Sequence, residues 1–411
     1  MRIVHLADLH LGTELYGRYD AATGSSSRLA DFADMLDRVV EQAIETRADL
    51  FLFGGDAYKT RDPNPTQQRE LARRLHRLLA AGVPVFLLTG NHDMPNAVAR
   101  ATSLDIFGAL SPAGFTVASK PGLHTIETRS GPLYVLAVPW ITRSAFFARD
   151  ENKNLPPEEL QRKLLERLDD SIAYNLERMT DDSIPAILTL HGTVQGAVYS
   201  TERSAMLSQD LTIPKSVICH PRFSYIALGH IHKHQVINND PLAVYAGSLE
   251  RIDFGEEHDE KGYVVVEVER HVARHEFVRL PARRFTTVDV RCDGDDPTAD
   301  VLQAIAGKDF AGAIVRIRVQ LTPVNQGRLR DADIRAAVRD ASYVVIRREV
   351  ERSWRESGRG QAFQSAMTPL EALTTYLDRE RLGESQDRRA MLLNAAQRLA
   401  ADVAAAGTDS Y

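Results

Sequence analysis

Seven short apolar runs, each three to five residues long, constrain the fold of this chain more than any other feature of its sequence. They are rich in β-branched and aromatic residues and almost free of charge, which is typical of strands buried on both faces. The runs span Ile3–Ala7, Leu50–Phe53, Val85–Leu88, Tyr134–Val138, Ala186–Leu190, Tyr225–Leu228 and Ala243–Tyr245.

Amphipathic patterns lie between these runs. Apolar residues recur at helical spacing from Phe32 to Ile44 and from Leu160 to Leu176, and the second pattern opens with prolines and glutamates at 156–159, a helix start signal. Because strands that alternate with helices pack in layers, we expect a layered α/β domain.

The chain has 411 residues, more than one compact domain usually holds. After the first domain, alternating patterns predict strand 286–292, helix 298–306, strand 313–321, helix 329–340 and strand 342–350. The predicted parts are an α/β domain at 1–284, a small α/β capping domain at 285–351, a linker at 352–366 and a helix pair at 367–411.

The amino-acid composition bears on the cellular location of the protein and on how it could bind nucleic acid. The chain has two cysteines, Cys219 and Cys292, so we expect no disulfide framework and a reducing, cytoplasmic location. No apolar run approaches the roughly 18 residues that span a bilayer, and the first residues lack a signal-peptide pattern. The net charge of −6 differs from that of proteins that bind DNA over their whole surface. A nucleic-acid substrate would therefore need a local basic surface or a partner that holds it.

Five short polar clusters follow the predicted strands, where ligands bind in open α/β sheets. Alone, each cluster is commonly a turn, a loop or a core histidine, but all five in order at strand ends favour one site. The clusters are Asp8-Leu9-His10, Gly54-Gly55-Asp56, Gly90-Asn91-His92-Asp93, His191-Gly192 and Gly229-His230-Ile231-His232.

These residue types indicate a metal centre. Carboxylates, an amide oxygen and imidazoles, without a thiolate, favour Mn, Fe or Zn. Seven ligands exceed one four-coordinate zinc but suit two metals that share a carboxylate, and such a pair about 3.5–4 Å apart can clamp a phosphoryl group during in-line displacement. We therefore predict a two-metal phosphodiesterase with the ligands Asp8, His10, Asp56, Asn91, His191, His230 and His232.

Together the clusters resemble the calcineurin-like metallophosphoesterase superfamily. Within it the chain is similar to the SbcD nuclease family, the prokaryotic counterpart of the eukaryotic meiotic-recombination double-strand-break nuclease. Three further stretches carry this closer resemblance: residues 82–93, residues 247–256 followed by Lys261-Gly262-Tyr263, and the Pro-Leu-Glu-Ala-Leu helix at 369–373.

The resemblance implies a role for each residue. Asp56 would bridge two ions, with Mn²⁺ expected for both, and His92 would face the scissile phosphate to stabilise the transition state or protonate the leaving oxygen. One ion would be bound by Asp8, His10, Asp56 and His232, and the other by Asp56, Asn91, His191 and His230.

The implied activity is that of a DNA nuclease, acting as a double-strand exonuclease and a single-strand or hairpin endonuclease. The chain would be the homodimeric catalytic subunit of an SbcC–SbcD-type ATPase complex in DNA repair and recombination. Its helix pair would dock on the coiled coil of the SbcC ATPase, or alternatively on its own first domain. The rival function is a stand-alone metallophosphatase or phosphodiesterase for small molecules or phosphoproteins. A scaffold role is disfavoured because all seven ligands and His92 are present.

Several residues keep two interpretations. Lys59 stands where many members of the resembling family have Asp or His, so we expect it, with Arg61, to contact DNA phosphate or to be an ordinary loop charge. Asp93 would orient the site or cap a local turn. The arginines of 69–79 form a DNA-binding stripe or a solvated helix face, and Leu104, Ile106, Phe107 and Leu110 form a dimer contact or belong to the core.

Overall fold

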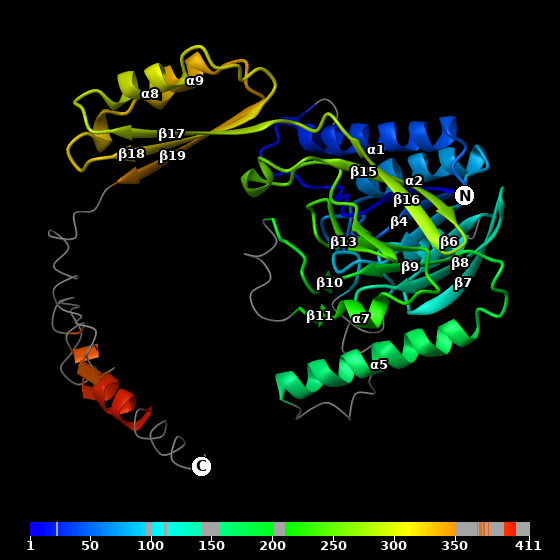
Figure 1. Ribbon diagram of the computed structural model, residues 1–411. Helices are drawn as coiled ribbons and strands as arrows, with labels where there is room; N and C mark the ends of the chain where they lie inside the picture. The colour runs from blue at the N-terminus through cyan, green and yellow to red at the C-terminus, as the bar shows by residue number, and fades with distance from the viewer. Residues whose placement is uncertain are drawn as a thin grey trace. The chain divides into compact units, whose positions relative to one another are not determined.

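Two six-stranded sheets form the centre of the first part of the chain in the computed structural model (Figure 1). The first sheet has the order β16-β15-β1-β4-β5-β6, and the second has the order β13-β14-β12-β9-β8-β7. The model describes residues 1–21, 24–95, 100–110, 113–141, 156–200, 210–350, 368, 370, 371, 373, 374, 377 and 390–399.

Parallel strands form the middle of both sheets. In the first, β1, β4, β5 and β6 are parallel, whereas β15 is antiparallel to β1 and to β16. In the second, β14, β12, β9 and β8 are parallel, with β13 and β7 as antiparallel edges. The bounds are β1 Arg2–Leu6, β4 Leu50–Phe53, β5 Val85–Leu88, β6 Phe115–Ala118, β7 Gly122–Thr128, β8 Gly131–Val138, β9 Ala186–His191, β12 Tyr225–Gly229, β13 Gln235–Asn239, β14 Leu242–Tyr245, β15 Gly262–Glu269 and β16 Val272–Arg279.

Helices cover the outer face of each sheet. Figure 1 shows α1 (Ser27–Glu45) and α2 (Pro65–Ala80) on one side of the paired sheets and α5 (Pro157–Glu177) on the other. Local signals set the helix starts, since Ser26 caps α1 and a capping box with Asn64 precedes Pro65 in α2. Short elements complete this part: β2 Tyr19–Asp20, β3 Ser25–Ser26, α3 Asp105–Leu110, β10 Thr193–Val194, β11 Thr212–Ile213, α7 Lys215–Ile218 and η1 Phe254–Glu256.

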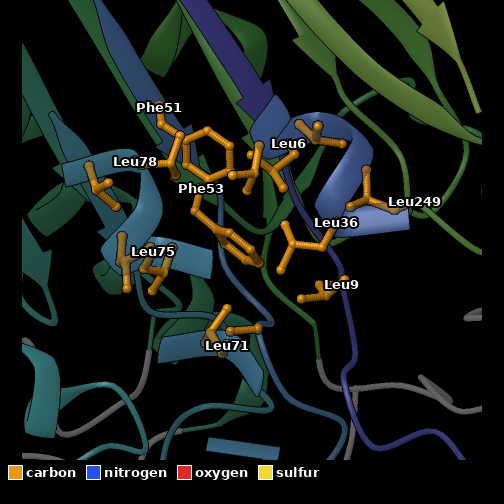
Figure 2. Packing of buried hydrophobic residues seen from close by; sticks show 14 of the residues in the cluster. Leu6, Leu9, Leu36, Phe51, Phe53, Leu71, Leu75, Leu78 and Leu249 are labelled. Carbon is orange, nitrogen blue, oxygen red and sulfur yellow. The ribbon is translucent and has the colours of Figure 1, made fainter. Parts of the chain in front are cut away.

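Three apolar layers hold this helix–sheet–sheet–helix arrangement together. Successive strand residues point to opposite faces, so Val4 packs toward α1 and α2 while its neighbour Ile3 packs between the sheets. Figure 2 shows the first layer, where Phe51 and Phe53 meet side chains of both helices. The third layer joins the second sheet to α5 and α7. The layered α/β fold predicted for this domain is confirmed.

A three-stranded sheet follows, in the order β17-β18-β19. The described chain forms two compact units, the first being Met1–Val288 with Gly307–Ile317 and Arg335–Ile346, and the second Asp289–Ala306 with Arg318–Ile334 and the described residues after Ile346. The elements are β17 Phe285–Cys292, α8 Pro297–Ile305, β18 Ile314–Leu321, η2 Gln326–Arg328, α9 Asp331–Ala337 and β19 Tyr343–Val350.

The end of the chain is described only in part. Residues 390–399 are helical and expose Met391, Leu392 and Leu399. The linker predicted at 352–366 and most of the helix pair predicted at 367–411 lie outside the described residues. Among the helices that the structure describes, none is both long and apolar enough to cross a bilayer.

Candidate metal centre

The predicted ligands come together where parallel strands of both sheets end. Asp8 and His10 follow β1, and Asp56 and Asn91 follow β4 and β5 in the same sheet. The remaining three come from the second sheet: His191 is the last residue of β9, and His230 and His232 follow β12. The site therefore needs both sheets, because neither sheet alone supplies all seven side chains.

Backbone conformation turns the loops toward the centre. Asp8, His10, Asp56 and His230 have φ angles of 53°, 47°, 58° and 100°. Residues other than glycine rarely adopt such φ angles. Where they do, the residue is preferentially part of a functional site. Backbone bonds tie the β1 and β4 loops together, because the N–H groups of Asp8 and His10 donate to Gly55 and Asp56 at 3.0 Å.

Asp8, His10 and His232 form one group of potential ligand atoms, all within 4.8 Å of one another. The Nε2 atoms of His10 and His232 are 3.0 Å apart, and His10 Nε2 is 3.6 Å from Oδ2 of Asp56. Two ring nitrogens this close share a proton or face a common cation. The donor set and its convergence fit a divalent ion.

A second group is formed by Asp8, Asp56 and His191. Oδ1 of Asp56 is 3.5 Å from His191 Nε2, and Oδ1 of Asn91 is 3.1 Å from both His191 Nε2 and His230 Nδ1. Asp56 thus directs one oxygen toward each group, as a carboxylate shared by two ions requires.

The buried carboxylates and imidazoles perturb one another strongly. Burial raises the pKa of Asp8 to about 7, and burial lowers the pKa of His10 well below its usual value. Burial acts to raise the pKa of Asp56, but the charges of His191, His10 and His92 together outweigh it and hold that pKa well below its usual range. For His191, burial is outweighed by Asp56 and the pKa rises to about 9. A bound cation would stabilise the ionised form of these carboxylates and the neutral form of these imidazoles.

Three of the four imidazoles have their second nitrogen held. His191 Nδ1 donates to the Gly54 carbonyl at 2.8 Å, and His230 Nε2 lies 3.3 Å from Asp210 Oδ2. His232 Nδ1 lies 2.7 Å from Glu256 Oε1. The sequence patterns did not indicate either carboxylate. Glu256 lies 24 residues after His232 in the chain, and no spacing pattern connects the two.

Two glycines leave the space that predicted ligands occupy. A Cβ on Gly90 would collide with Oδ1 of Asp56 and lie 2.8 Å from Cε1 of His191. Gly55 has a φ of 103°, and a Cβ there would collide with Nδ1 of His191 and lie 2.8 Å from Cγ of the same ring. A larger residue at either position would push a ligand out of place.

His92 lies beside the ligands. Its backbone N–H donates to Asp56 Oδ1 at 2.8 Å, and its Nδ1 donates to the Lys59 carbonyl at 2.8 Å. Its ring centroid is 4.7 Å from that of His10, and His92 also forms a potential ligand group with His10 and Asp56. Burial lowers the pKa of His92.

The three weaker candidates have different surroundings. Asp93 is fully buried and accepts the N–H groups of Asp56 at 2.9 Å and Gly90 at 3.0 Å, so it holds the loops after β4 and β5 together. Lys59 supplies the carbonyl that orients His92. Arg61 lines a surface groove with residues of α3.

Residues 1–234 match the family described as calcineurin-like phosphoesterase. The chain belongs to this family. It is therefore a metallophosphoesterase, a hydrolase with a site for two metals. Among solved structures it is similar to a dimetal phosphatase from Danio rerio, with 13% identity over 67% of this chain and 98% of that chain and a TM-score of 0.38. It is also similar to a Thermus thermophilus protein, with 14% identity over 67% of this chain and 98% of that chain and a TM-score of 0.36.

Proposed function

We propose that this phosphoesterase is a two-metal DNA nuclease and the catalytic subunit of an SbcC–SbcD-type ATPase complex. One observation carries the proposal. The stretch 247–256, on which the resemblance to SbcD partly rests, reaches the metal centre through Glu256, which bonds the candidate ligand His232. Residues that support this closer resemblance therefore contribute to the metal site as well as to the fold.

Different residues of the chain have different roles in the proposed reaction. Two divalent ions bound at the site, Mn²⁺ in our proposal, supply Lewis-acid activation of water and of the phosphoryl oxygen. Asp56 sets the spacing of the two ligand groups, and Asn91 joins His191 and His230 on one side. The Lys59 carbonyl accepts the proton on Nδ1 of His92. Nε2 is therefore the ring nitrogen that is left to exchange a proton with the substrate.

Burial lowers the pKa of His92 and so favours the neutral ring. A bound phosphodiester acts in the opposite direction because its negative charge stabilises the imidazolium. We infer that the proton that His92 delivers to the leaving oxygen is taken up as the substrate binds. The positive charge of Lys59 lowers the pKa of both His10 and His92, so this charge lies close to the site, and we propose that the Lys59 side chain contacts phosphate there.

We further propose a homodimer and a partner ATPase. Leu104, just before α3, and Phe107 on α3 are buried in the core, whereas the exposed fractions of Ile106 and Leu110 are 51% and 74%. These two exposed side chains are the ones we assign to a dimer contact. The exposed Leu392 and Leu399 are assigned to the ATPase coiled coil.

The decisive assay uses end-labelled hairpin DNA with and without Mn²⁺ and with and without the ATPase partner. We expect cleavage that depends on Mn²⁺, and a loss of about 10²–10⁴-fold in His92→Ala, the usual contribution of a general acid or base. Metal content must stay at two ions in that variant. Undiminished cleavage by His92→Ala would reject its role. Strong turnover of a cyclic nucleotide or a phosphoprotein without DNA cleavage would support the rival phosphatase.

A further inference from the structure

We propose that the buried ion pair of Glu256 and Lys261 is a positioning device for His232, fixing the ring and tautomer with which it meets the metal ion. The inference rests on the two-metal site of the proposed function but does not depend on DNA being the substrate. It gives residues 247–261 a function, whereas the reaction chemistry alone requires none of them.

The ring of His232 has two different environments. Nε2 faces the metal centre, 3.0 Å from His10 Nε2, whereas Nδ1 lies 2.7 Å from Oε1 of Glu256. A carboxylate only accepts hydrogen bonds, so Nδ1 carries the proton and Nε2 keeps its lone pair for the metal. A carboxylate behind a ligating histidine also makes that ligand more basic.

Glu256 is itself held rigidly. Its Oε2 accepts the N–H of Ile252 at 3.0 Å and lies 2.8 Å from Nζ of Lys261, and the side chains of Glu256 and Lys261 are both 0% exposed. Lys261 also donates to Ser248 Oγ at 2.8 Å and to the His232 carbonyl at 3.2 Å. The Ser248 N–H donates to the same carbonyl at 3.0 Å. One segment therefore fixes both the ring and the backbone of His232.

Close approach at this point requires a glycine. Gly247 has a φ of 77°, and a Cβ there would lie 2.9 Å from the His232 carbonyl oxygen and 2.7 Å from the backbone nitrogen of His234. The glycine thus lets Ser248 reach His232. The pattern Gly-Ser followed by Glu256 and Lys261 supplies each of these contacts.

Stability alone does not account for the pair. Burying two opposite charges costs desolvation, and well-packed apolar residues of similar volume are often neutral or better for folding. His191, the comparable ligand of the second sheet, is held by the neutral carbonyl of Gly54 instead. A charged pair that ends on a ligand nitrogen indicates a contribution to metal binding.

The first test is titration calorimetry of Mn²⁺ into metal-free protein. Wild type should bind two ions. Glu256→Gln should bind one of them about 10–100-fold more weakly, the usual effect of losing such a ligand partner, and the other unchanged. Glu250→Gln is the matched control. Its carboxylate is buried in the same stretch but bonds the N–H groups of Arg251 and Arg283, so its loss should leave Mn²⁺ affinity unchanged.

The second test separates positioning from folding. Glu256→Gln leaves Lys261 buried without its carboxylate, whereas Glu256→Gln combined with Lys261→Met removes both charges. We expect the double variant to recover stability in denaturant unfolding but to keep the weakened Mn²⁺ affinity. Wild-type affinity for both ions in either folded variant would overturn the inference. Failure of wild type to bind two ions would instead overturn the proposed function.

Discussion

At the scale of single residues, burial also acts on a histidine that lies beside the site and is not one of its predicted ligands. His5 lies on β1 between the two sheets, and its Nδ1 is 2.8 Å from the Tyr225 hydroxyl. Its Nε2 has no partner among the residues that the structure describes. Burial lowers the pKa of His5 to about 3. Burial, together with the charge of the nearby His234, therefore favours the neutral ring of His5, as burial also does for His10 and His230.

His5 should therefore limit stability in acid. Above pH 6.5 the ring is neutral in both states, but below it the unfolded chain binds a proton that the folded chain does not accept. The free energy of unfolding falls as the pH drops from 6.5 toward 3, and by about 2 kcal/mol from His5 alone between pH 6.5 and about 5. His5→Gln should flatten this slope in urea unfolding, whereas His76→Gln, on the exposed face of α2, should not. Equal slopes for wild type and His5→Gln would contradict the prediction.

Gly90 is a second residue whose surroundings matter, because they leave no space for a larger side chain. In Gly90→Ala the added methyl group meets Asp56 and His191, so the ligands must shift. We expect a loss of about 1–3 kcal/mol in stability, typical of overpacking, together with weaker Mn²⁺ binding. Calorimetry and denaturant unfolding measure the two effects. Gly122→Ala, which has open space around its Cβ position, should change neither.

At the scale of elements, the arginines of α2 show how packing decides between two interpretations of a charge pattern. Arg74 is 2.5 Å from Asp37 on α1 and 2.9 Å from Glu70, and Arg77 also pairs with Asp37. Arg69 and Arg73 lie near Glu70 as well. The stripe is largely neutralised and serves the α1–α2 contact, which disfavours a DNA-binding face.

Substitutions on α2 test this assignment. Arg74→Met should cost roughly 2–3 kcal/mol, because it removes charge-assisted bonds to Asp37, Glu70 and the Ala33 carbonyl. Arg73→Met should cost well under about 1 kcal/mol, as expected for an exposed pair. Denaturant unfolding measures both. A loss of DNA affinity in Arg73→Met, with unchanged stability, would restore the DNA-binding interpretation.

At the scale of the whole molecule, the metal centre joins the two sheets. Asp8 and Asp56 come from the first and His191 and His230 from the second, so bound ions would link elements far apart in the chain. Without bound ions, the buried carboxylates of Asp8 and Asp56 lie near one another with only neighbouring histidines to offset their charge. Metal binding and folding of the first unit should therefore be coupled.

Chelation should make this coupling visible. At free Mn²⁺ about 100 times its dissociation constant, the loaded protein should be more stable than the chelated protein by about 2.7 kcal/mol per site. Unfolding curves with EDTA and after Mn²⁺ is restored measure the difference. Asp56→Asn, which lacks the shared carboxylate, should respond much less. Identical curves for wild type in both conditions would show that the ions do not bind the folded state.

Much of the local structure could be predicted. Strands β4 and β5 have the bounds of the apolar runs that predicted them, because short uncharged runs have few other ways to be buried. The polar residues after the strands could be identified as one site for a related reason. The carboxyl ends of parallel strands meet at one edge, so Asp8, Asp56 and Asn91 had to come close.

Tertiary contacts decided the rest. No periodicity places β15 beside β1 or divides the strands between two sheets, since pairing depends on residues far apart in the chain. The sequence by itself determined the ligand types and their strand-end positions. Only the folded chain decided which nitrogen of His232 meets the metal, because Glu256 and Lys261 reach it through space and leave no spacing pattern in the sequence.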